Sequence, residues 1–331
     1  MNTKVTVIVP AFNEEQTIQR CIESLLNQTI VPNIIVVNDG STDKTLEVLL
    51  KYKHLNNFLV IDQANQGVSA ARNHGIRASK TDLITFLDAD DYVEKSFIQT
   101  LLSGYLRYKD INLSVCNYSI KNQQDTVSYG KFKTGVVNQN TYFGSIISDN
   151  GANGFVYNKM FRKSVIEKYN VWFNTQIAIG EDFLFCFLYG RYCNKIYFNN
   201  SVQVHYLPTN SGISDTMQIK GRFSVKIFDY FFANLEIIKF LTFLDSNEYI
   251  NSLINKEIYR TSMAATTIIR KVYLYNQTKY FNNLEQLKKF LKDNFWTIMK
   301  SNEVNSSDKL KIFLSIYLPS LLKQIDKVKV G

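Results

Sequence analysis

The sequence predicts an α/β protein: a mostly parallel sheet with helices on both faces, followed by a helical C-terminal region. Short apolar runs alternate with amphipathic stretches through the first 110 residues. Beyond about residue 216 the apolar positions follow a helical period instead. Hydrophobic residues make up 45% and charged residues 20% of the 331 positions. This composition excludes disordered, collagen-like and coiled-coil chains, and the length allows one large or two ordinary domains.

Four β-α units account for the N-terminal alternation. Strands are expected at 5–10, 33–38, 58–62 and 83–88, and each is followed by an amphipathic segment. The first helix is predicted from apolar residues at i, i+3, i+4, i+7 and i+8, namely Ile18, Cys21, Ile22, Leu25 and Leu26. Repeated β-α units imply parallel strands covered by helices on both faces.

The alternation fails after the strand-like run at 114–120. The polar stretch 121–135 is read as a hairpin or a surface loop. A helix is expected after Gly180, in EDFLFCFLYGRYC, and a β segment at 195–207, before Pro208. Three helical segments follow: IFDYFFANLEIIKFLTFL, SMAATTIIRKVYLY and LEQLKKFLKDNFWTIM.

The formal net charge of +9 favours association with anions but does not identify them. Four cysteines in apolar contexts, without CxxC spacing, indicate neither a disulfide framework nor a zinc site, so a reducing compartment is expected. The N-terminal apolar run is short and ends at Pro10, unlike a signal peptide, and no window has 18 uncharged apolar residues. We therefore expect a cytoplasmic protein without a transmembrane helix.

The strongest local signal is LDADD at 87–91, where a predicted strand ends. Asp88 and Asp90 flank the small Ala89, so both carboxylates can face one cation, and Asp91 adds negative charge. Hard oxygen ligands suit Mg²⁺ or Mn²⁺ shared with a diphosphate. The alternative is a solvated acidic turn that caps the next helix. The position after an apolar strand favours the metal, because ligand crevices border the carboxyl ends of parallel strands.

Asp39 and Arg72 have two interpretations each. Asp39 caps the helix that begins near Asp43, or it accepts a hydrogen bond from the imide N–H of uracil or thymine. Arg72, at the start of the third predicted helix, neutralises a diphosphate with its fork of donors, or it is a surface residue.

Glu181 and Asp182 follow Gly180 at a predicted helix N-terminus, where the macrodipole alone would favour acids. The functional alternative makes Asp182 a general base. His54 and His74 are read as structural. His205 precedes a loop at 209–214, which could close as a lid and bring the imidazole onto a metal or diphosphate; a half-exposed histidine at a strand end is the alternative.

Six motifs, in order and spacing, resemble the family 2 glycosyltransferases of the GT-A fold over residues 3–215: VIVPAFNEE, VVNDGSTD, ANQGVSAARNHGI, FLDADD, GEDF and VHYLPTNSGIS. The resemblance implies that residues 1–110 form the nucleotide-sugar-binding half and 111–215 the acceptor-binding, catalytic half of one GT-A domain. Residues 216–331 then form the helical C-terminal region.

Carried onto matching positions, the resemblance assigns these residues to nucleotide binding: Pro10, Phe12, Glu14, Asp39, Asn65, Arg72, Asp88 and Ala89. Within that set, Asp39 reads the base and Asp88 holds the ribose or the donor sugar. Asp90 and His205 are the implied ligands of Mn²⁺ or Mg²⁺.

For the reaction, the resemblance implies that Glu181 contacts the donor or acceptor sugar and that Asp182 is the base. Attack by an acceptor hydroxyl on the opposite face from the leaving group inverts the anomeric carbon. The processive QxxRW motif does not occur, so transfer of single sugars is expected. The resemblance to this family also implies that the donor is a UDP-sugar.

The acceptor is expected to be a glycan or a polyprenyl-linked sugar of a bacterial surface polysaccharide. The segment 309–330 places an apolar run, Ile312 to Leu322, between lysines. It predicts either a peripheral anchor on the inner face of the plasma membrane or an ordinary packed terminal helix. The aromatic C-terminal helices could instead form a homo-oligomer interface.

Three other functions compete. A sugar-phosphate nucleotidyltransferase would need a glycine-rich, basic loop after the first strand, where this chain has PAFNEE. A non-catalytic partner subunit of another glycosyltransferase predicts that a metal or base carboxylate is missing, but Asp88, Asp90 and Asp182 are all present. A nucleic-acid binder needs a dense basic run or interleaved stacking residues, and neither occurs in the sequence.

Overall fold

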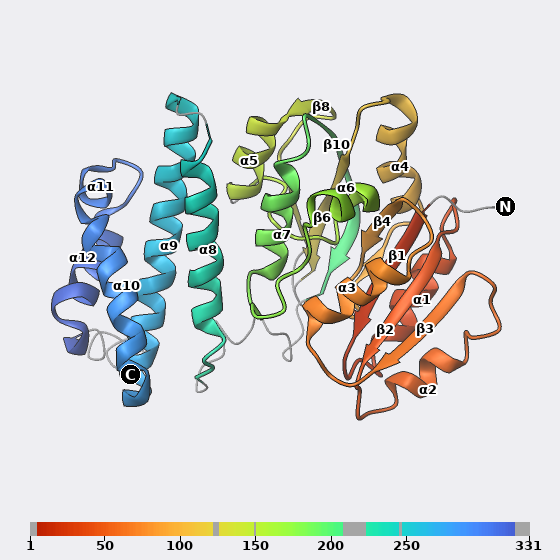
Figure 1. Cartoon of the computed structure of the whole chain (residues 1–331), viewed down its shortest axis with the longest axis horizontal. Helices are drawn as coiled ribbons and strands as arrows, with labels where there is room; N and C mark the ends of the chain where they lie inside the picture. The colour runs from red at the N-terminus through yellow and green to blue at the C-terminus, as the bar shows by residue number, and fades with distance from the viewer. Residues whose placement is uncertain (1–4, 122–125, 149, 208–222, 245–246, 322–331) are drawn as a thin grey trace. The chain divides into compact units, whose positions relative to one another are not determined.

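The computed structural model describes residues 5–121, 126–148, 150–207, 223–244 and 247–321 (Figure 1). The chain divides into two compact units, Met1–Gly212 and Ile213–Gly331. The first unit contains the sheet and the second is helical. The loop at 209–214, which was predicted as a lid, lies outside the described residues.

The four predicted N-terminal strands are confirmed and are all parallel. They are β1 (Val5–Ala11), β2 (Asn33–Asp39), β3 (Phe58–Gln63) and β4 (Leu83–Phe86), in the spatial order β3-β2-β1-β4. Every residue of β1 is buried, as expected of a central strand covered on both faces. Their carboxyl ends therefore meet at one edge of the sheet.

Helices cover both faces because alternate strand residues point to opposite sides. Val7 and Val9 of β1 share a core with α1 (Ile18–Leu26), α2 (Thr45–Leu50) and α4 (Phe97–Arg107). Ile35 and Val37 of β2 pack instead with Ala71 of α3 (Val68–Ala78). The predicted α/β class with helices on both faces is confirmed.

Beyond β4 the sheet becomes mixed and continues in the order β4-β9-β6-β10-β5. The strand β9 (Lys159–Arg162) pairs antiparallel with both β4 and β6 (Leu113–Lys121). The long β10 (Lys195–Tyr206) runs parallel to β6 and antiparallel to the short β5 (Tyr92–Val93). Thus β5 brings the residues that follow LDADD beside His205.

Two shorter strands complete the sheet. The strand β7 (Thr126–Tyr129) pairs antiparallel with β6, so the predicted hairpin or surface loop contains a hairpin. The strand β8 (Gly135–Asn138) pairs with β10. The helices α5 (Gln139–Ile147) and α6 (Lys163–Tyr169) were not among the predicted elements, whereas α7 (Glu181–Gly190) begins after Gly180 as predicted.

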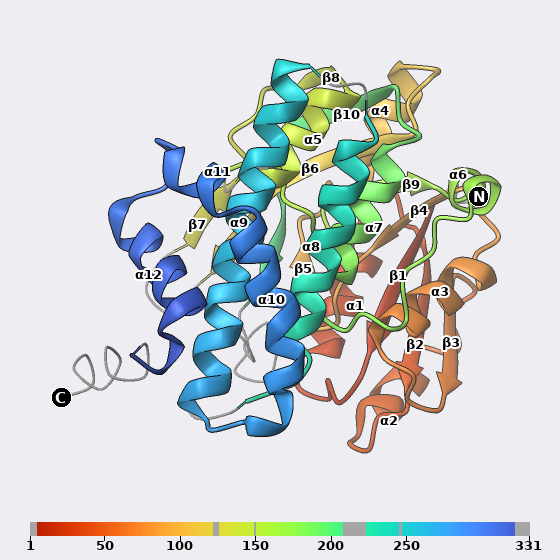
Figure 2. The same cartoon turned by 60° about the vertical axis from the view of Figure 1, so that its left-hand side comes forward.

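The helical unit consists of α8 (Ile227–Thr242), α9 (Glu248–Leu274), the 3-10 helix η2 (Thr278–Tyr280), α10 (Phe281–Asp293), α11 (Phe295–Lys300) and α12 (Ser306–Tyr317). The long helix α9 packs against α8, α10, α11 and α12 (Figure 2). Asn247 and Asn305 cap α9 and α12 by accepting hydrogen bonds from backbone N–H groups. Within the described ranges, none of the helices is both long and apolar enough to cross a bilayer.

Candidate active site

The loops after β1 and β2 are tied together at the carboxyl edge of the sheet. The backbone N–H of Asn13 donates to Ser41 Oγ at 3.0 Å, and Asn13 Oδ1 accepts from the Thr42 N–H at 2.8 Å. Asn13 has a positive φ of 57°, which asparagine tolerates better than most residues. Glu15 adds a bond from the Lys44 N–H to its carboxylate at 2.9 Å. The two loops therefore form one connected rim.

Pro10, Phe12 and Glu14 all lie on or next to this rim. Pro10 is tolerated in a central strand although it has no backbone N–H to donate. It lies two residues after Ile8, so its nitrogen faces the same side, toward β4, and the pairing of β1 with β4 has already ended at Ile8. The Phe12 ring is 47% exposed. Burial raises the pKa of Glu14, and the Asp88 carboxylate adds to the rise. A flat apolar face and a carboxyl group thus flank the strand ends.

Asp39 is buried and fastens the loop that leads into α3. Its Oδ1 accepts from Gln63 Nε2 at 2.7 Å and from the Gln66 N–H at 2.9 Å, and its Oδ2 accepts from the Gly67 N–H at 2.7 Å. The predicted cap of the helix near Asp43 is not its role, because all three donors belong to residues 63–67. Recognition of a base by Asp39 would therefore use Oδ2, which accepts one of these three hydrogen bonds and has capacity for another.

Asn65 is exposed on the same loop, close to Gly40. Gly40 has φ +72°, and a Cβ there would lie 2.7 Å from the Asn65 backbone nitrogen. Only glycine permits this approach without a shift of the loop. The predicted residues Asp39 and Asn65 are therefore brought together beside the strand ends.

Arg72 is buried and joins two carboxylates from distant parts of the chain. Its Nη2 lies 2.9 Å from Asp88 Oδ1, and its Nη1 lies 2.8 Å from Glu181 Oε1. Burial works against the charge of Arg72, but Asp88 and Glu181 raise its pKa above the ordinary value. The Phe173 ring lies under the guanidinium, with its centroid at 5.3 Å. The structure thus pairs Arg72 with carboxylates, where the sequence interpretations were a diphosphate partner or a surface residue.

The Arg72 bridge brings the first turn of α7 to the end of β4. Asp182 is partly buried, and its Oδ1 accepts from the Phe183 N–H at 2.7 Å. Burial and the negative charge of Glu181 raise the pKa of Asp182 to about 7, although Arg72 opposes the rise. A carboxyl group with a pKa near neutrality is suited to accept a proton.

In the LDADD segment, the side chains diverge. Ala89 is buried in the apolar core, whereas Asp88 and Asp90 are partly exposed. Asp91 is fully buried and accepts from the Leu207 N–H at 3.0 Å. Burial, with Asp90 and Asp88 nearby, raises the pKa of Asp91 well above its ordinary value. Asp91 therefore fastens the end of β10, whereas Asp88 turns one oxygen to the buried Arg72.

His205 has a side-chain partner on each ring nitrogen. Its Nε2 lies 2.8 Å from Glu94 Oε1, its Nδ1 lies 2.8 Å from Ser119 Oγ, and its ring stacks on Tyr92 at 4.6 Å. Because Glu94 can only accept when ionised, Nε2 donates to Glu94, and Ser119 Oγ occupies Nδ1. Ligation of a metal by His205 would require one of these bonds to break.

The donor set fits a divalent cation only in part. Asp88 and Asp90 offer hard oxygens, as Mg²⁺ or Mn²⁺ prefers. Nowhere in the described part of the chain do three or more His, Cys, Asp or Glu side chains form a metal-binding group. This pair therefore suits a cation that shares its remaining positions with phosphate oxygens and water.

Two residues near Asp182 were missed by sequence reasoning. Lys159 of β9 is fully buried. Tyr157 is also buried, and burial raises the pKa of its hydroxyl, with the carboxylates of Asp88 and Asp182 adding to the rise. A lysine inside the apolar run GFVYNKMF was the only sequence signal.

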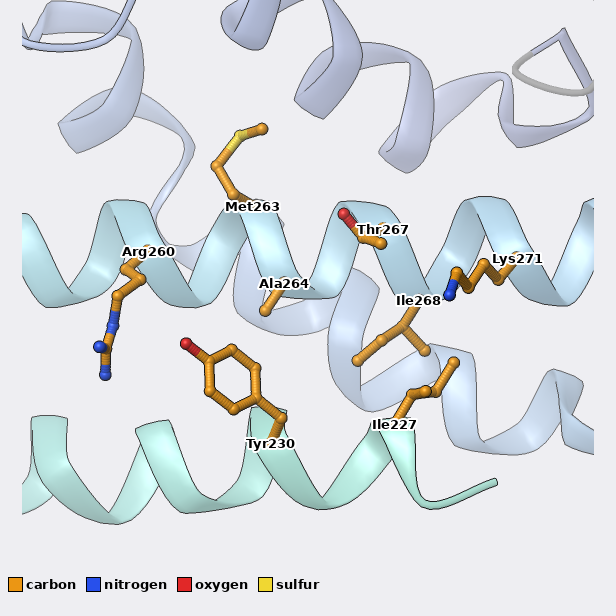
Figure 3. A pocket seen from close by; sticks show the side chains of 8 residues that line it. All are labelled: Ile227, Tyr230, Arg260, Met263, Ala264, Thr267, Ile268 and Lys271. Atoms are coloured by element: carbon orange, nitrogen blue, oxygen red, sulfur yellow. The ribbon is translucent and has the colours of Figure 1, made fainter. Parts of the chain in front are cut away.

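The helical unit has a cavity of about 270 Å³ between α8 and α9, which Figure 3 shows from close by. Tyr230 points from α8 toward α9, and Arg260 points from α9 toward α8. Its lining is Ile227, Tyr230, Arg260, Met263, Ala264, Thr267, Ile268 and Lys271. The predicted site residues do not line it.

Similar proteins support the fold and the family. EpsH of Bacillus subtilis (strain 168), named as a glycosyltransferase, is 30% identical over 222 residues, which are 65% of this chain and 64% of EpsH. TarP of Staphylococcus aureus (strain N315), a poly(ribitol-phosphate) beta-N-acetylglucosaminyltransferase, is 33% identical over 187 residues, which are 55% and 56% of the two chains. This chain therefore spans less than two thirds of either relative.

Two solved structures share the GT-A architecture. S. aureus TarS 1-349 in complex with UDP-GlcNAc superposes with a TM-score of 0.66 and 17% identity, over 98% of this chain and 92% of that chain. The mannosyltransferase PcManGT from Pyrobaculum calidifontis, in complex with GDP-Man and Mn²⁺, gives a TM-score of 0.54 and 12% identity, over 98% and 88%. The family model described as Glycosyl transferase family 2 matches residues 6–170. On that match, residues 6–170 of this chain belong to glycosyl transferase family 2.

Proposed function

We propose that the chain transfers a single sugar from a UDP-sugar to a hydroxyl of a glycan or lipid-linked acceptor, with inversion at the anomeric carbon. The observation that carries this proposal is the Arg72 bridge between Asp88 and Glu181. It joins the donor-side rim to the helix that begins with Glu181 and Asp182. A leaving-group site and a base are therefore neighbours.

Nucleotide binding is assigned to the rim formed by the loops after β1, β2 and β3. Phe12 offers a ring face for the base, and the loops are fixed by the bonds of Asn13 and Asp39 before any ligand arrives. The complex of TarS with UDP-GlcNAc supports uridine as the base. Asp88 is proposed to contact the ribose or the donor sugar.

Asp182 is the proposed general base. It takes the proton of the acceptor hydroxyl while the new C1–O bond forms and the bond from C1 to the diphosphate oxygen breaks. The nucleoside diphosphate leaves with the bonding electron pair. Because the base and the leaving group lie on opposite faces of the sugar, the anomeric configuration inverts.

Asp90, together with Asp88, is the proposed holder of a divalent cation, and the Mn²⁺ in the PcManGT structure supports this assignment. Such a cation supplies positive charge to the departing diphosphate. The two aspartates would hold this cation with their carboxylate oxygens. His205 is left out of this proposal because both of its ring nitrogens are engaged.

A membrane-bound acceptor is supported by exposed apolar residues on α11, on α12 and directly after α12, which we call the aromatic patch: Trp296, Leu310, Phe313, Tyr317, Leu318 and Leu321. Trp296 is 69% exposed. Phe295 contacts the rings of Trp296, Phe313 and Tyr317. The exposed Lys300 and Lys311 lie on the same two helices. Aromatic rings with neighbouring lysines suit an anionic lipid interface.

The proposed location is the cytoplasmic face of the membrane, which four buried free cysteines support. The remainder of the predicted anchor, residues 322–330, lies outside the described residues.

The function is tested by incubating the full chain with a panel of UDP- and GDP-sugars, with Mn²⁺ present or chelated, and measuring nucleoside diphosphate release. We expect one UDP-sugar to be hydrolysed slowly and to be transferred when a polyprenyl-linked or glycan acceptor is added. NMR of the product should show inversion. Retention of the anomeric configuration would show that Asp182 is not the general base. No release of nucleoside diphosphate with any donor would reject the proposed function.

A further inference from the structure

Lys159 is a fully buried lysine whose ammonium group collects oxygens from one loop. Its Nζ lies 3.3 Å from the carbonyl oxygen of Ala152, 2.7 Å from that of Asn153 and 2.7 Å from that of Phe155. It also lies 2.8 Å from Asn158 Oδ1. Four acceptors around one nitrogen require the charged form, which has three N–H donors and no lone pair.

This arrangement is costly if its only purpose is packing. Burying a charge is unfavourable unless the charge is paired and hydrogen-bonded. The described residues include no carboxylate in an ion pair with Lys159. Burial lowers the pKa of the ammonium, and Cys186 and Asp182 oppose that decrease. The three carbonyl bonds must therefore carry most of the compensation, so the geometry of residues 152–155 depends on Lys159.

The loop 152–155 lies directly on the first turns of α7. A Cβ on Gly154 would lie 1.8 Å from Phe183 Cδ2 and 2.8 Å from the Phe183 Cα. One turn later, the thiol of Cys186 donates to the Phe155 carbonyl oxygen at 3.6 Å. The backbone at 154 therefore has no room to move toward α7, which begins with Glu181 and Asp182.

We propose that Lys159 is a positioning residue for Asp182: it clamps the loop 152–155 against the first turn of α7 and places a buried positive charge near the base. This inference rests on the proposed function. The clamp sets where the Asp182 carboxylate meets the acceptor hydroxyl, and the charge favours the ionised carboxylate.

Lys159→Met tests both parts, because methionine keeps an apolar stem but removes the charge and the donors. We expect kcat to fall about 10- to 100-fold, since misplacement of a reacting group by an ångström has that effect. The KM for the UDP-sugar and the thermal shift with UDP should stay within about twofold of the wild type, because the hydrogen bonds of the loop 152–155 within the described residues do not run to the loops after β1, β2 and β3.

The pH profile separates positioning from simple damage to the fold. The base must be ionised, so loss of a nearby positive charge should move the acid limb of kcat to higher pH. The ionisable groups that interact with Asp182 are Glu181 on its own helix, Arg72 of α3, Asp88 after β4, Lys159 of β9, and the buried Tyr157 and Cys186. All except Lys159 are unchanged in the variant.

Lys163→Met is the matched control. Lys163 is a largely buried lysine close in sequence, and its Nζ donates to the Ser79 carbonyl oxygen at 2.7 Å and pairs with Glu167. Its loss removes one lysine and one carbonyl bond of the same kind. We expect kcat within about twofold of the wild type and an unchanged acid limb.

Gly154→Ala provides a second route if Lys159→Met does not fold. The added methyl should displace the loop or Phe183 while Lys159 keeps its charge, so kcat should fall without a shift of the acid limb. Wild-type kcat and an unmoved acid limb in folded Lys159→Met, or wild-type kcat in Gly154→Ala, would overturn the inference. The proposed function would survive both results, since it fails only if the wild type transfers no sugar or if Asp182→Asn stays active.

Discussion

Each unit of the molecule has an arginine in an ion pair, buried Arg72 in the sheet unit and partly exposed Arg260 in the helical unit, and the two clusters differ in their charge balance. In the sheet unit, Arg72 bridges Asp88 and Glu181, and Asp182 lies next in sequence. In the helical unit, Arg260 Nη2 lies 3.0 Å from Glu257 Oε1 and donates to Asn234 Oδ1 at 3.1 Å. Within the described residues, Asp88, Glu181 and Asp182 gather around Arg72, whereas Glu257 pairs with Arg260.

We use this difference as a guide to which cluster does the proposed chemistry. The pair of Arg260 and Glu257 sets one positive charge against one negative charge. Three carboxyl groups around one arginine leave an excess of negative charge, which adds to burial in raising the pKa of Asp182 to about 7. The pKa of Glu257 is also raised to about 7, but by burial, with the charge of Arg260 opposing the rise. The excess lies where parallel strands end, and the balanced pair lies between packed helices. Charge imbalance at a sheet edge is therefore the more informative signal.

The largest expected effect is that of Arg72→Met. It leaves Asp88 and Glu181 without their common cation, and loss of one partner of a buried ion pair costs about 3–5 kcal/mol. Urea unfolding should report this loss, and donor turnover should disappear. Arg260→Met should cost less, because Glu257 can take up a proton. Equal costs for the two variants would contradict the distinction between the clusters.

Asp182→Asn should have the next largest effect. An amide cannot accept the hydroxyl proton, so turnover should fall by about 10²–10⁴-fold while UDP still binds. Glu257→Gln is the matched control from the balanced cluster, and its turnover should match the wild type. Both rates are measured by UDP release with the preferred donor. Retained turnover in Asp182→Asn would remove it as the base.

The N-terminal half of the fold could be predicted from sequence because β1, β2 and β4 are short, mostly apolar runs with nearly every residue buried. The strand β9 could not, because it has four residues and contains Lys159, whose burial depends on carbonyls from a loop. Side-chain partners that are distant in the sequence could not be predicted either. Arg72 and Glu181 are 109 residues apart, and no local pattern reports that they meet.

In the candidate site, too, the positions of residues could be predicted from sequence but their partners could not. Residues at strand ends, such as Asp39 and Asp88, lie at the predicted edge because topology alone puts them there. Their partners depend on side-chain packing. His205 illustrates this, since its bonds to Glu94 and Ser119 arise only when β5 and β6 flank β10.

Titration of Glu257 should produce a smaller effect, on stability alone. Burial raises its pKa to about 7 from an ordinary 4.5, with Arg260 opposing. A raised carboxyl pKa means that the folded state holds the proton more tightly. Its contribution to stability is complete below pH 4.5 and is lost as the pH rises through about 7, by up to about 3 kcal/mol.

Glu257→Gln should remove this dependence. The two tryptophans, Trp172 and Trp296, lie in different units, so Trp172→Phe leaves a reporter in the helical unit. In that background, the free energy of unfolding measured in urea should change less between pH 5 and pH 8 for Glu257→Gln than for the protein that keeps Glu257. The same pH dependence in both proteins would mean that Glu257 is not the titrating group.

The smallest expected effect concerns the aromatic patch, which would give the helical unit a binding role outside its balanced cluster. Phe313→Ser removes one exposed ring, and burial of such a ring in a lipid interface contributes about 1–2 kcal/mol. Binding to vesicles with anionic lipid should weaken by about tenfold in a sedimentation assay. Phe243→Ser is the control, because Phe243 is 86% exposed at the end of α8, outside the patch. If both variants bind as the wild type does, the membrane contact lies elsewhere; if both weaken equally, binding depends on general hydrophobicity. Only a selective loss in Phe313→Ser would assign membrane contact to this patch of the helical unit.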